Sequence, residues 1–178
     1  MGYNCDMKNG HWLEGTRCYL SGPIEYDAKP DWRVEPVTAL SKRKVVVFDP
    51  AADEKQNAVP LLKVAREAKD YAEMAKICRG FVRKDLCLVD RCDFLISCLP
   101  HGVPTAGSHH EIIVADNDKK PVLLVCPEGK QFVPLWLYGF IPHECMFGGW
   151  ADLWEYLDQV DKGDQKDNRR WSFVYGLI

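Results

Sequence analysis

The stretch DFLISCLPHGVPTAGSHHEIIVA, residues 93–115, decides the fold of this chain. Its first seven residues form a continuous apolar run, which is typical of a strand covered on both faces. Two prolines and a glycine in residues 100–104 end the strand, and we expect a helix over residues 108–118. A strand, a loop of small residues and a helix in this order form the unit of open α/β sheets. Such sheets bind ligands outside the carboxyl ends of their strands.

Other apolar runs repeat the pattern on either side. We expect strands at residues 16–21, 44–48, 121–126 and 145–147, and helices at residues 31–43, 59–89 and 151–160. Pro36 marks the expected start of the first of these helices, and Gly80 is expected to break the second in two. Strands that alternate with helices predict an α/β fold. The expected architecture is a single doubly wound domain with a mostly parallel sheet of about five strands.

Three segments are expected along the chain. Residues 1–15 are polar and rich in glycine, and we expect a loose lead-in there. Residues 16–161 form the α/β domain. Residues 162–178 are expected to be a charged, mobile linker followed by an apolar tail, and the tail is too apolar to be left in water.

The composition indicates a globular protein. The chain has 178 residues, of which 47% are hydrophobic and 28% charged, and its formal net charge is −3. Because there is no basic surplus to neutralise phosphates, we expect no nucleic-acid polymer as a partner. No apolar run reaches membrane-spanning length, and the first residues lack the apolar core of a signal peptide. We therefore expect a cytoplasmic protein with no membrane partner.

The cysteines and histidines do not form a recognisable metal site. The eight cysteines contain no C-x-x-C pair and several lie inside apolar runs, so we expect buried, reduced thiols. His109 and His110 lack a third ligand at a recognisable spacing. We expect neither a metal nor an organic cofactor.

Glu111 is the most informative carboxylate, because it lies at the start of the expected helix. The positive end of a helix dipole favours an ionised carboxylate, which suits a nucleophile. In sugar chemistry such a group can attack the anomeric carbon and hold a covalent glycosyl intermediate. The same residues are also a capping box, with Ser108 as the N-cap and Glu111 reaching back to it. The spacing alone leaves both interpretations open.

Weaker candidates lie at other element ends. Gly22 and Pro23 follow the first strand, where a glycine lets the backbone approach a ligand, and Tyr19 can offer its hydroxyl there or serve as a core aromatic. Gly107 and Ser108 lie at a helix start that can hold a phosphate.

Taken together, five segments resemble the nucleoside 2-deoxyribosyltransferase family, which includes related 2′-deoxynucleoside 5′-monophosphate N-hydrolases. The match runs in order over residues 18–127. The segments that carry it are YLSGP (19–23), RKDL (83–86), DFLI (93–96), GSHHE (107–111) and KPVLLV (120–125).

The resemblance implies a flavodoxin-like sheet and a catalytic carboxylate. It implies that Glu111 is the nucleophile, that Tyr19 orients it and that Asp85 lies near the sugar as a proton donor to the leaving base. It also implies a homo-oligomer, a dimer or larger, in which a neighbour's carboxyl-terminal segment closes each pocket. The apolar tail that ends in Tyr175 and Ile178 fits that function.

Two departures from the family pattern bear on the substrate. Transferases carry an Asp six residues before the nucleophile, where this chain has Thr105; the monophosphate hydrolases have a Ser there, which Thr105 resembles more. The hydrolases also carry an Arg soon after the first-strand glycine, where this chain has Glu25. A negative side chain there repels a 5′-phosphate unless it turns away.

The sequence therefore predicts an enzyme that cleaves the N-glycosidic bond of 2′-deoxynucleosides and transfers the sugar to another nucleobase. Its partners would be a small deoxynucleoside or deoxynucleotide and a nucleobase. Hydrolysis of 2′-deoxynucleoside 5′-monophosphates is the alternative within the family. A non-catalytic module that senses nucleotides is the alternative from another class.

Overall fold

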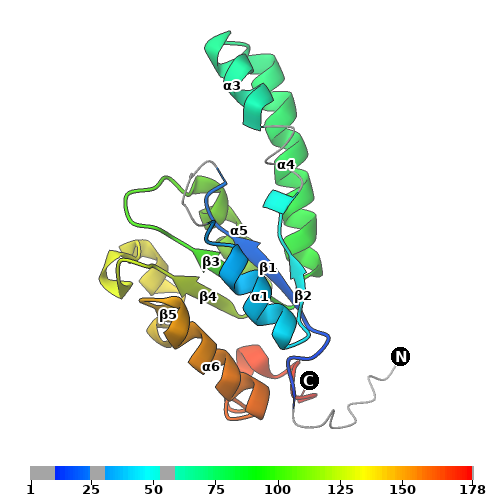
Figure 1. Ribbon diagram of the computed structural model, residues 1–178, viewed down its shortest axis with the longest axis vertical. Coiled ribbons are helices and arrows are strands. Elements are labelled where there is room, and N and C mark those ends of the chain that lie inside the picture. The colour runs from blue at the N-terminus through cyan, green and yellow to red at the C-terminus, as the bar shows by residue number, and fades with distance from the viewer. Residues whose placement is uncertain (1–10, 25–30, 53–58, 178) are drawn as a thin grey trace.

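A computed structural model describes residues 11–24, 31–52 and 59–177 and shows a five-stranded, wholly parallel sheet (Figure 1). The strands are β1 (Arg17–Ser21), β2 (Val46–Phe48), β3 (Phe94–Cys98), β4 (Val122–Val125) and β5 (Met146–Phe147). They pair in the order β2-β1-β3-β4-β5, the flavodoxin-like order. The predicted fold class and strand number are confirmed.

The register places the ends of β1 and β3 side by side. Tyr19 pairs with Leu95 and Ser21 with Ser97, and all four side chains are buried. Strand order reverses between β1 and β3, so this is the switch point at which such sheets bind ligands. The residues of β1 and β3 are apolar at most positions because helices cover both faces of the sheet.

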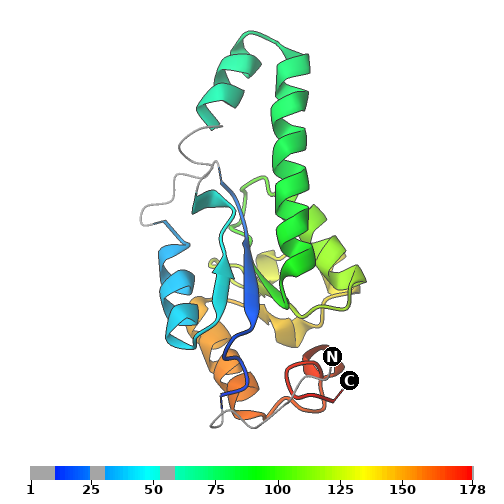
Figure 2. The ribbon, with the colours of Figure 1, turned by 90° about the vertical axis from the view of Figure 1, so that its right-hand side faces the viewer.

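Helices cover both faces of the sheet (Figure 2). One face carries α1 (Val34–Lys42) and α6 (Trp150–Lys162), which are joined by an ion pair with 2.6 Å between Nη2 of Arg43 and Oδ1 of Asp158. The other face carries α4 (Tyr71–Arg91) and α5 (Ala106–Asn117). The connection from β4 to β5 has only short 3-10 turns among the described elements. They are Lys130–Phe132, Leu135–Gly139 and His143–Cys145.

The predicted break at Gly80 is wrong. Gly80 lies inside α4, and the chain instead turns between α3 (Val59–Glu67) and α4. Lys69 adopts a left-handed conformation with φ of 55°, and the Asp70 side chain then caps α4 by accepting a hydrogen bond from the Glu73 amide at 3.0 Å. The two helices form a hairpin that extends beyond the carboxyl ends of the strands (Figure 1).

The apolar tail is buried against its own chain, at the amino ends of the strands. Trp171 is fully buried, its ring lies 5.3 Å from the Phe94 ring, and its Nε1 donates to the Tyr156 hydroxyl at 2.9 Å. The Tyr175 hydroxyl donates to the Val160 carbonyl at 2.9 Å. These two side chains are therefore covered by the core of their own chain, and the expectation that the tail closes a neighbour's pocket stays a prediction. Ile178 lies outside the described residues.

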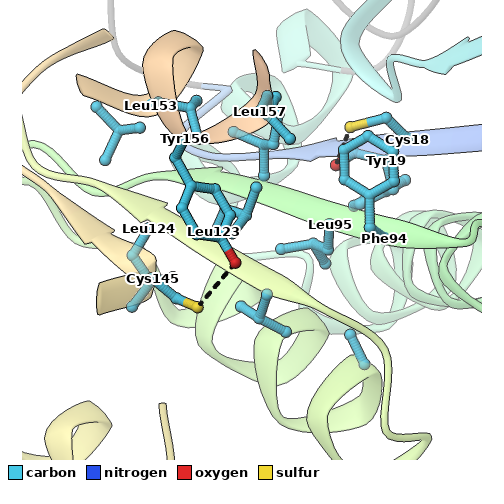
Figure 3. Packing of buried hydrophobic residues seen from close by; sticks show 14 of the residues in the cluster. Cys18, Tyr19, Phe94, Leu95, Leu123, Leu124, Cys145, Leu153, Tyr156 and Leu157 are labelled. Carbon is cyan, nitrogen blue, oxygen red and sulfur yellow. Dashed lines mark hydrogen bonds between the residues drawn. The ribbon is translucent and has the colours of Figure 1, made fainter. Parts of the chain in front are cut away.

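The same end of the molecule anchors part of the expected lead-in. The backbone amide of Leu13 donates to Oδ1 of Asp161 at 2.8 Å, and the Leu13 side chain is fully buried. Figure 3 shows the nearby core, in which Tyr156 of α6 lies beside Cys145, with 3.9 Å between the hydroxyl and Sγ. Residues 1–10 lie outside the described part of the chain.

Most of the described cysteines are small core residues, as expected. Five of them are buried free thiols: Cys18, Cys92, Cys98, Cys126 and Cys145. Cys78 and Cys87 are exposed on α4, so the expectation is wrong for these two. Cys5 lies outside the described residues.

Candidate active site

The Glu111 carboxylate is held by two hydroxyl groups of β1. The Tyr19 hydroxyl donates to Oε1 at 2.9 Å, and the Ser21 hydroxyl donates to Oε2 at 2.5 Å. Tyr19 and Ser21 lie two positions apart in the strand, so both point to the same face of the sheet. Each carboxylate oxygen therefore has its own donor, and the orientation of the group is fixed.

The capping-box interpretation of Ser108 and Glu111 is wrong. The helix α5 begins at Ala106 with Thr105 as its N-cap, so Ser108 lies inside the first turn and Glu111 in the second. The Thr105 side chain makes no capping hydrogen bond. The expected helix-dipole effect on Glu111 is correspondingly weak, because the dipole acts mainly within the first turn.

The pKa of Glu111 lies above its ordinary value. Burial of the carboxylate raises the pKa, and this outweighs the hydrogen bonds from Ser21 and Tyr19 and the positive charges of Arg33 and His110, which lower it. This is the opposite direction to that expected from the helix dipole. Because a raised pKa means a more basic carboxylate, the ionised group is a stronger nucleophile than an exposed one.

A cavity of about 800 Å³ lies in front of Glu111, within the size range of small-molecule sites. Its walls come from the loop after β1, from α3 and α4, and from the loop and first turns of α5. The α4 residues that line it are Cys78, Phe81, Val82, Asp85 and Leu86, which recur at helical spacing.

The cavity brings together most of the residues singled out in the sequence. Gly22, Pro23, Thr105, Gly107 and Ser108 line it together with Asp85 and Glu111, and Tyr19 lies behind the carboxylate. Asp85 is 8% exposed and faces the same space from α4. Glu25 lies outside the described residues.

Gly22 is required by a close approach of two other segments. A Cβ atom there would lie 2.4 Å from a ring carbon of Trp32 and 3.1 Å from the Cys98 carbonyl oxygen. Its φ of 158° is also one that side-chain-bearing residues rarely adopt. The chain after β1 therefore passes between Trp32 and the end of β3, and only glycine fits.

Sequence reasoning missed two residues of the site. Ser21 had a usable signal, since it lies two positions after Tyr19 in a strand and must share its face. Arg33 had none, because an arginine beside a tryptophan ahead of a helix is an ordinary surface pattern. The structure buries Arg33 to 3% exposure.

The two histidines next to Glu111 lie differently. Nδ1 of His109 lies 2.8 Å from the Thr105 carbonyl oxygen, which ties it to the start of α5, whereas His110 lines the cavity. Within the described part of the chain, no group of three or more His, Cys, Asp or Glu side chains is placed to hold a metal ion. In the same residues, no helix is long and apolar enough to cross a membrane.

Fold and site together define a flavodoxin-like α/β protein with a buried, oriented carboxylate facing a cavity at the switch point of its sheet. No protein-family model matches the chain, and no curated protein matches it in sequence. Its structure is similar to that of a 2-deoxyribosyltransferase from Bacillus psychrosaccharolyticus, with a TM-score of 0.61 and 16% identity over 79% of this chain and 92% of the other. A 2-desoxiribosyltransferase from Leishmania mexicana has a TM-score of 0.42 and 16% identity over 65% and 67%. The first likeness shows a shared fold.

Proposed function

We propose that this chain is a nucleoside 2-deoxyribosyltransferase-like enzyme, which moves 2-deoxyribose from one nucleobase to another through Glu111. The observation that carries the proposal is the Glu111 carboxylate, oriented by Tyr19 and Ser21 and facing the same cavity as Asp85. The likeness to the Bacillus enzyme supports it, since that protein is a 2-deoxyribosyltransferase with the same fold.

The chemistry proceeds in two displacements at C1′. In the first, an oxygen of Glu111 forms a bond to C1′ while the bond from C1′ to the base nitrogen breaks, and the base leaves with that electron pair and a proton from Asp85. In the second, a nitrogen of the incoming base attacks C1′, gives its proton to Asp85 and releases Glu111. No 2′-hydroxyl withdraws electrons from the sugar, so the cation-like transition state is easier to reach.

The surroundings of Glu111 fit these steps. The two hydroxyl donors hold the carboxylate in one orientation, which is the arrangement that a nucleophile needs for a defined line of attack. The apolar side chains of α4 offer a face against which a base can stack: Phe81, Val82 and Leu86.

The test is an assay of 2′-deoxynucleosides with and without a second base, with products separated by chromatography. Transfer appears as a new deoxynucleoside, whereas hydrolysis appears as free sugar in the absence of an acceptor base. Denatured protein from a reaction without acceptor should carry a deoxyribosyl group on the peptide that contains Glu111, found by mass spectrometry. The adduct should be lost in Glu111→Gln and kept in the control Glu144→Gln, because the Glu144 side chain is 66% exposed. Absence of both products and of the adduct would refute the proposal.

Hydrolysis of 2′-deoxynucleoside 5′-monophosphates is the second candidate. It is favoured by Thr105, Gly107 and Ser108, which line the cavity at the start of α5, where backbone amides attract a phosphate. If the monophosphate is the better substrate and Thr105→Val removes that preference, this candidate replaces transfer. Stabilisation by nucleotides in a thermal-shift assay without any turnover would instead favour a sensing module.

A further inference from the structure

Arg33 is a buried cation close to the candidate active site that the proposed reaction steps do not use. We propose that Arg33 is a positioning residue: it clamps the Gly22–Pro23 turn and holds a permanent positive charge on the side of the site where Glu111 lies. The expected effects on kcat/KM rest on the proposed function. The expected effects on the Gly22–Pro23 turn and on the titration of Glu111 do not.

The guanidinium holds the turn by its backbone. Nη2 donates to the Gly22 carbonyl at 3.0 Å, and Nη1 donates to the Pro23 carbonyl at 3.2 Å. Two parallel donors in a planar fork fix both the distance and the direction of the turn, which a single ammonium group cannot do. Because Gly22 and Pro23 line the cavity, the arginine sets one of its walls.

The other side of the guanidinium is tied to the end of β2. Nε lies 3.1 Å from Oδ1 of Asp49, whose Oδ1 also accepts a hydrogen bond from the Ala51 amide at 2.9 Å. Asp49 directly follows β2, so the arginine connects the ends of two neighbouring strands across the turn. A buried charge requires such a partner, because desolvating an unpaired arginine is costly.

A column of stacked tryptophan rings packs against the Arg33 guanidinium. The Arg33 guanidinium carbon lies 4.3 Å from the centre of the Trp32 ring. The Trp32 ring stacks on Trp150 at 5.9 Å, and Trp150 stacks on Trp154 at 5.7 Å. Arg43 lies over the far side of this column, 5.5 Å from the Trp154 ring centre. The rings therefore extend from α6 to the turn that lines the cavity, with an arginine at each end.

The guanidinium of Arg33 also lies close to Glu111, because it binds the carbonyl of Gly22, the residue next to Ser21, whose hydroxyl donates to the Glu111 carboxylate at 2.5 Å. Its field lowers the pKa of the carboxylate, against the stronger upward effect of burial. Among the described residues, the other polar groups on this side are the Tyr19 and Ser21 hydroxyls of β1 and His110 of α5, and Asp85 of α4 lines the same cavity. Asp49, whose Oδ1 lies 3.1 Å from Nε of Arg33, partly offsets the charge of the guanidinium at Glu111.

The experiment measures the titration of Glu111 directly, by carbon-13 NMR of the carboxyl groups, with Glu111→Gln to assign the signal. The variants are Arg33→Met, which removes the charge and the fork, and Arg33→Lys, which keeps the charge alone. Arg43→Met is the matched control. It removes an arginine from the other end of the same ring column, together with an ion pair to Asp158.

The expected outcome differs for each variant. In Arg33→Met the titration midpoint of Glu111 moves to higher pH, whereas in Arg33→Lys and Arg43→Met it stays at the wild-type value. An unchanged midpoint in folded Arg33→Met would overturn the electrostatic part. If Arg33→Met does not fold, Arg33→Lys decides through kinetics. In Arg33→Lys we expect kcat/KM to fall by about tenfold or more, because a small misplacement of reacting groups costs up to about a hundredfold. The acidic limb of its plot of kcat/KM against pH should stay at the wild-type position.

Wild-type kcat/KM in Arg33→Lys would overturn the positioning part, since lysine cannot reproduce the two-pronged hold. Failure of the proposed function is a separate result. A wild-type protein inactive on every deoxynucleoside and deoxynucleotide would refute that function. The NMR midpoints would still decide whether Arg33 controls the carboxylate, and the crystallographic position of the Gly22–Pro23 turn in Arg33→Lys would decide the clamp.

Discussion

The two ends of the parallel sheet are built in opposite ways. At the amino ends of the strands, charges form close ion pairs, with 2.7 Å between Arg17 Nη2 and Asp93 Oδ1 and 2.6 Å between Arg170 Nη2 and Asp116 Oδ1. The apolar Trp171 fills the space between elements there. At the carboxyl ends, the Arg33–Asp49 ion pair is buried beside the site, but the Glu111 carboxylate has no ion pair of its own among the described residues. Its donors there are the Tyr19 and Ser21 hydroxyls, and it faces a cavity.

This difference separates the residues that stabilise the fold from those arranged for chemistry. The filled core at the amino ends lowers the free energy of the folded state. A desolvated Glu111 raises it at neutral pH, because its pKa in the folded protein lies above the value in the unfolded chain. We expect substitutions at the two ends to move activity and stability in different combinations.

The largest effect is expected for Glu111→Gln. Loss of the nucleophile should lower kcat by about a thousandfold or more. The same variant should raise the melting temperature at neutral pH. A carboxyl group whose folded pKa is raised contributes stability that is complete below its unfolded pKa and is lost as pH rises through the folded value. Steady-state kinetics and thermal unfolding at several pH values measure both.

The gain in melting temperature should shrink toward acidic pH, where the wild-type carboxyl is protonated in both states. Glu144→Gln is the control, because this side chain is exposed and no such gain is expected. Activity within about tenfold of wild type would refute the nucleophile, since its removal normally costs far more. Lower stability at neutral pH would show that hydrogen bonding outweighs burial at this carboxylate.

The second effect concerns the opposite end of the sheet. Trp171→Ala should lower the free energy of unfolding by about 3–5 kcal/mol, as truncation of a large buried aromatic does. The kcat of the molecules that remain folded should stay at the wild-type value. Denaturant unfolding and kinetics well below the melting temperature measure the two quantities. A large fall in kcat in a fully folded sample would show that the amino ends of the strands are coupled to the site.

Sequence patterns predicted the features that depend on neighbouring residues. All five strands followed from apolar runs, and the proximity of Tyr19, Asp85 and Glu111 followed from the family resemblance. The start of α5 was missed by two residues because Ser108 is a better N-cap by type than Thr105. The break before α4 had a local signal, Asp70 with Glu73 three residues later, but Gly80 was the more obvious breaker.

Features that depend on distant residues and lie outside the family resemblance could not be predicted. The sequence shows that the tail is apolar and must be covered, yet Trp171 is covered by Phe94, far away along the chain, and by Tyr156 of the preceding helix. The predicted direction of the Glu111 pKa shift was wrong for the same reason. Burial is a property of the assembled site, whereas the helix dipole is a property of the local pattern.

The third effect is expected for Asp85, which lines the same cavity as Glu111. If Asp85 gives its proton to the leaving base, Asp85→Asn should slow cleavage about tenfold or more for poor leaving bases and much less for good ones, since general-acid catalysis contributes about a hundredfold or more. The measurement is kcat/KM for a series of deoxynucleosides whose bases differ in basicity. An equal loss across the series would instead assign Asp85 to positioning of the sugar.

The smallest effects are expected for the two hydroxyl donors, and they appear as changes in pH dependence. The reacting form of Glu111 is ionised, so kcat/KM falls as pH drops through its pKa, which burial has already raised. Each donor stabilises the ionised form, and a hydrogen bond to a charged group is worth about 1.5–3 kcal/mol. Ser21→Ala and Tyr19→Phe should therefore both move the acidic limb of the profile to higher pH. Ser21→Ala should move it further, because the Ser21 hydrogen bond lowers the pKa of Glu111 more than that from Tyr19 does. At pH values above the limb the losses in kcat/KM should be much smaller.

A limb that stays in place in both variants would show that a group other than Glu111 controls the profile. The carboxyl ends of the strands would then lack the titrating nucleophile that sets them apart from the amino ends.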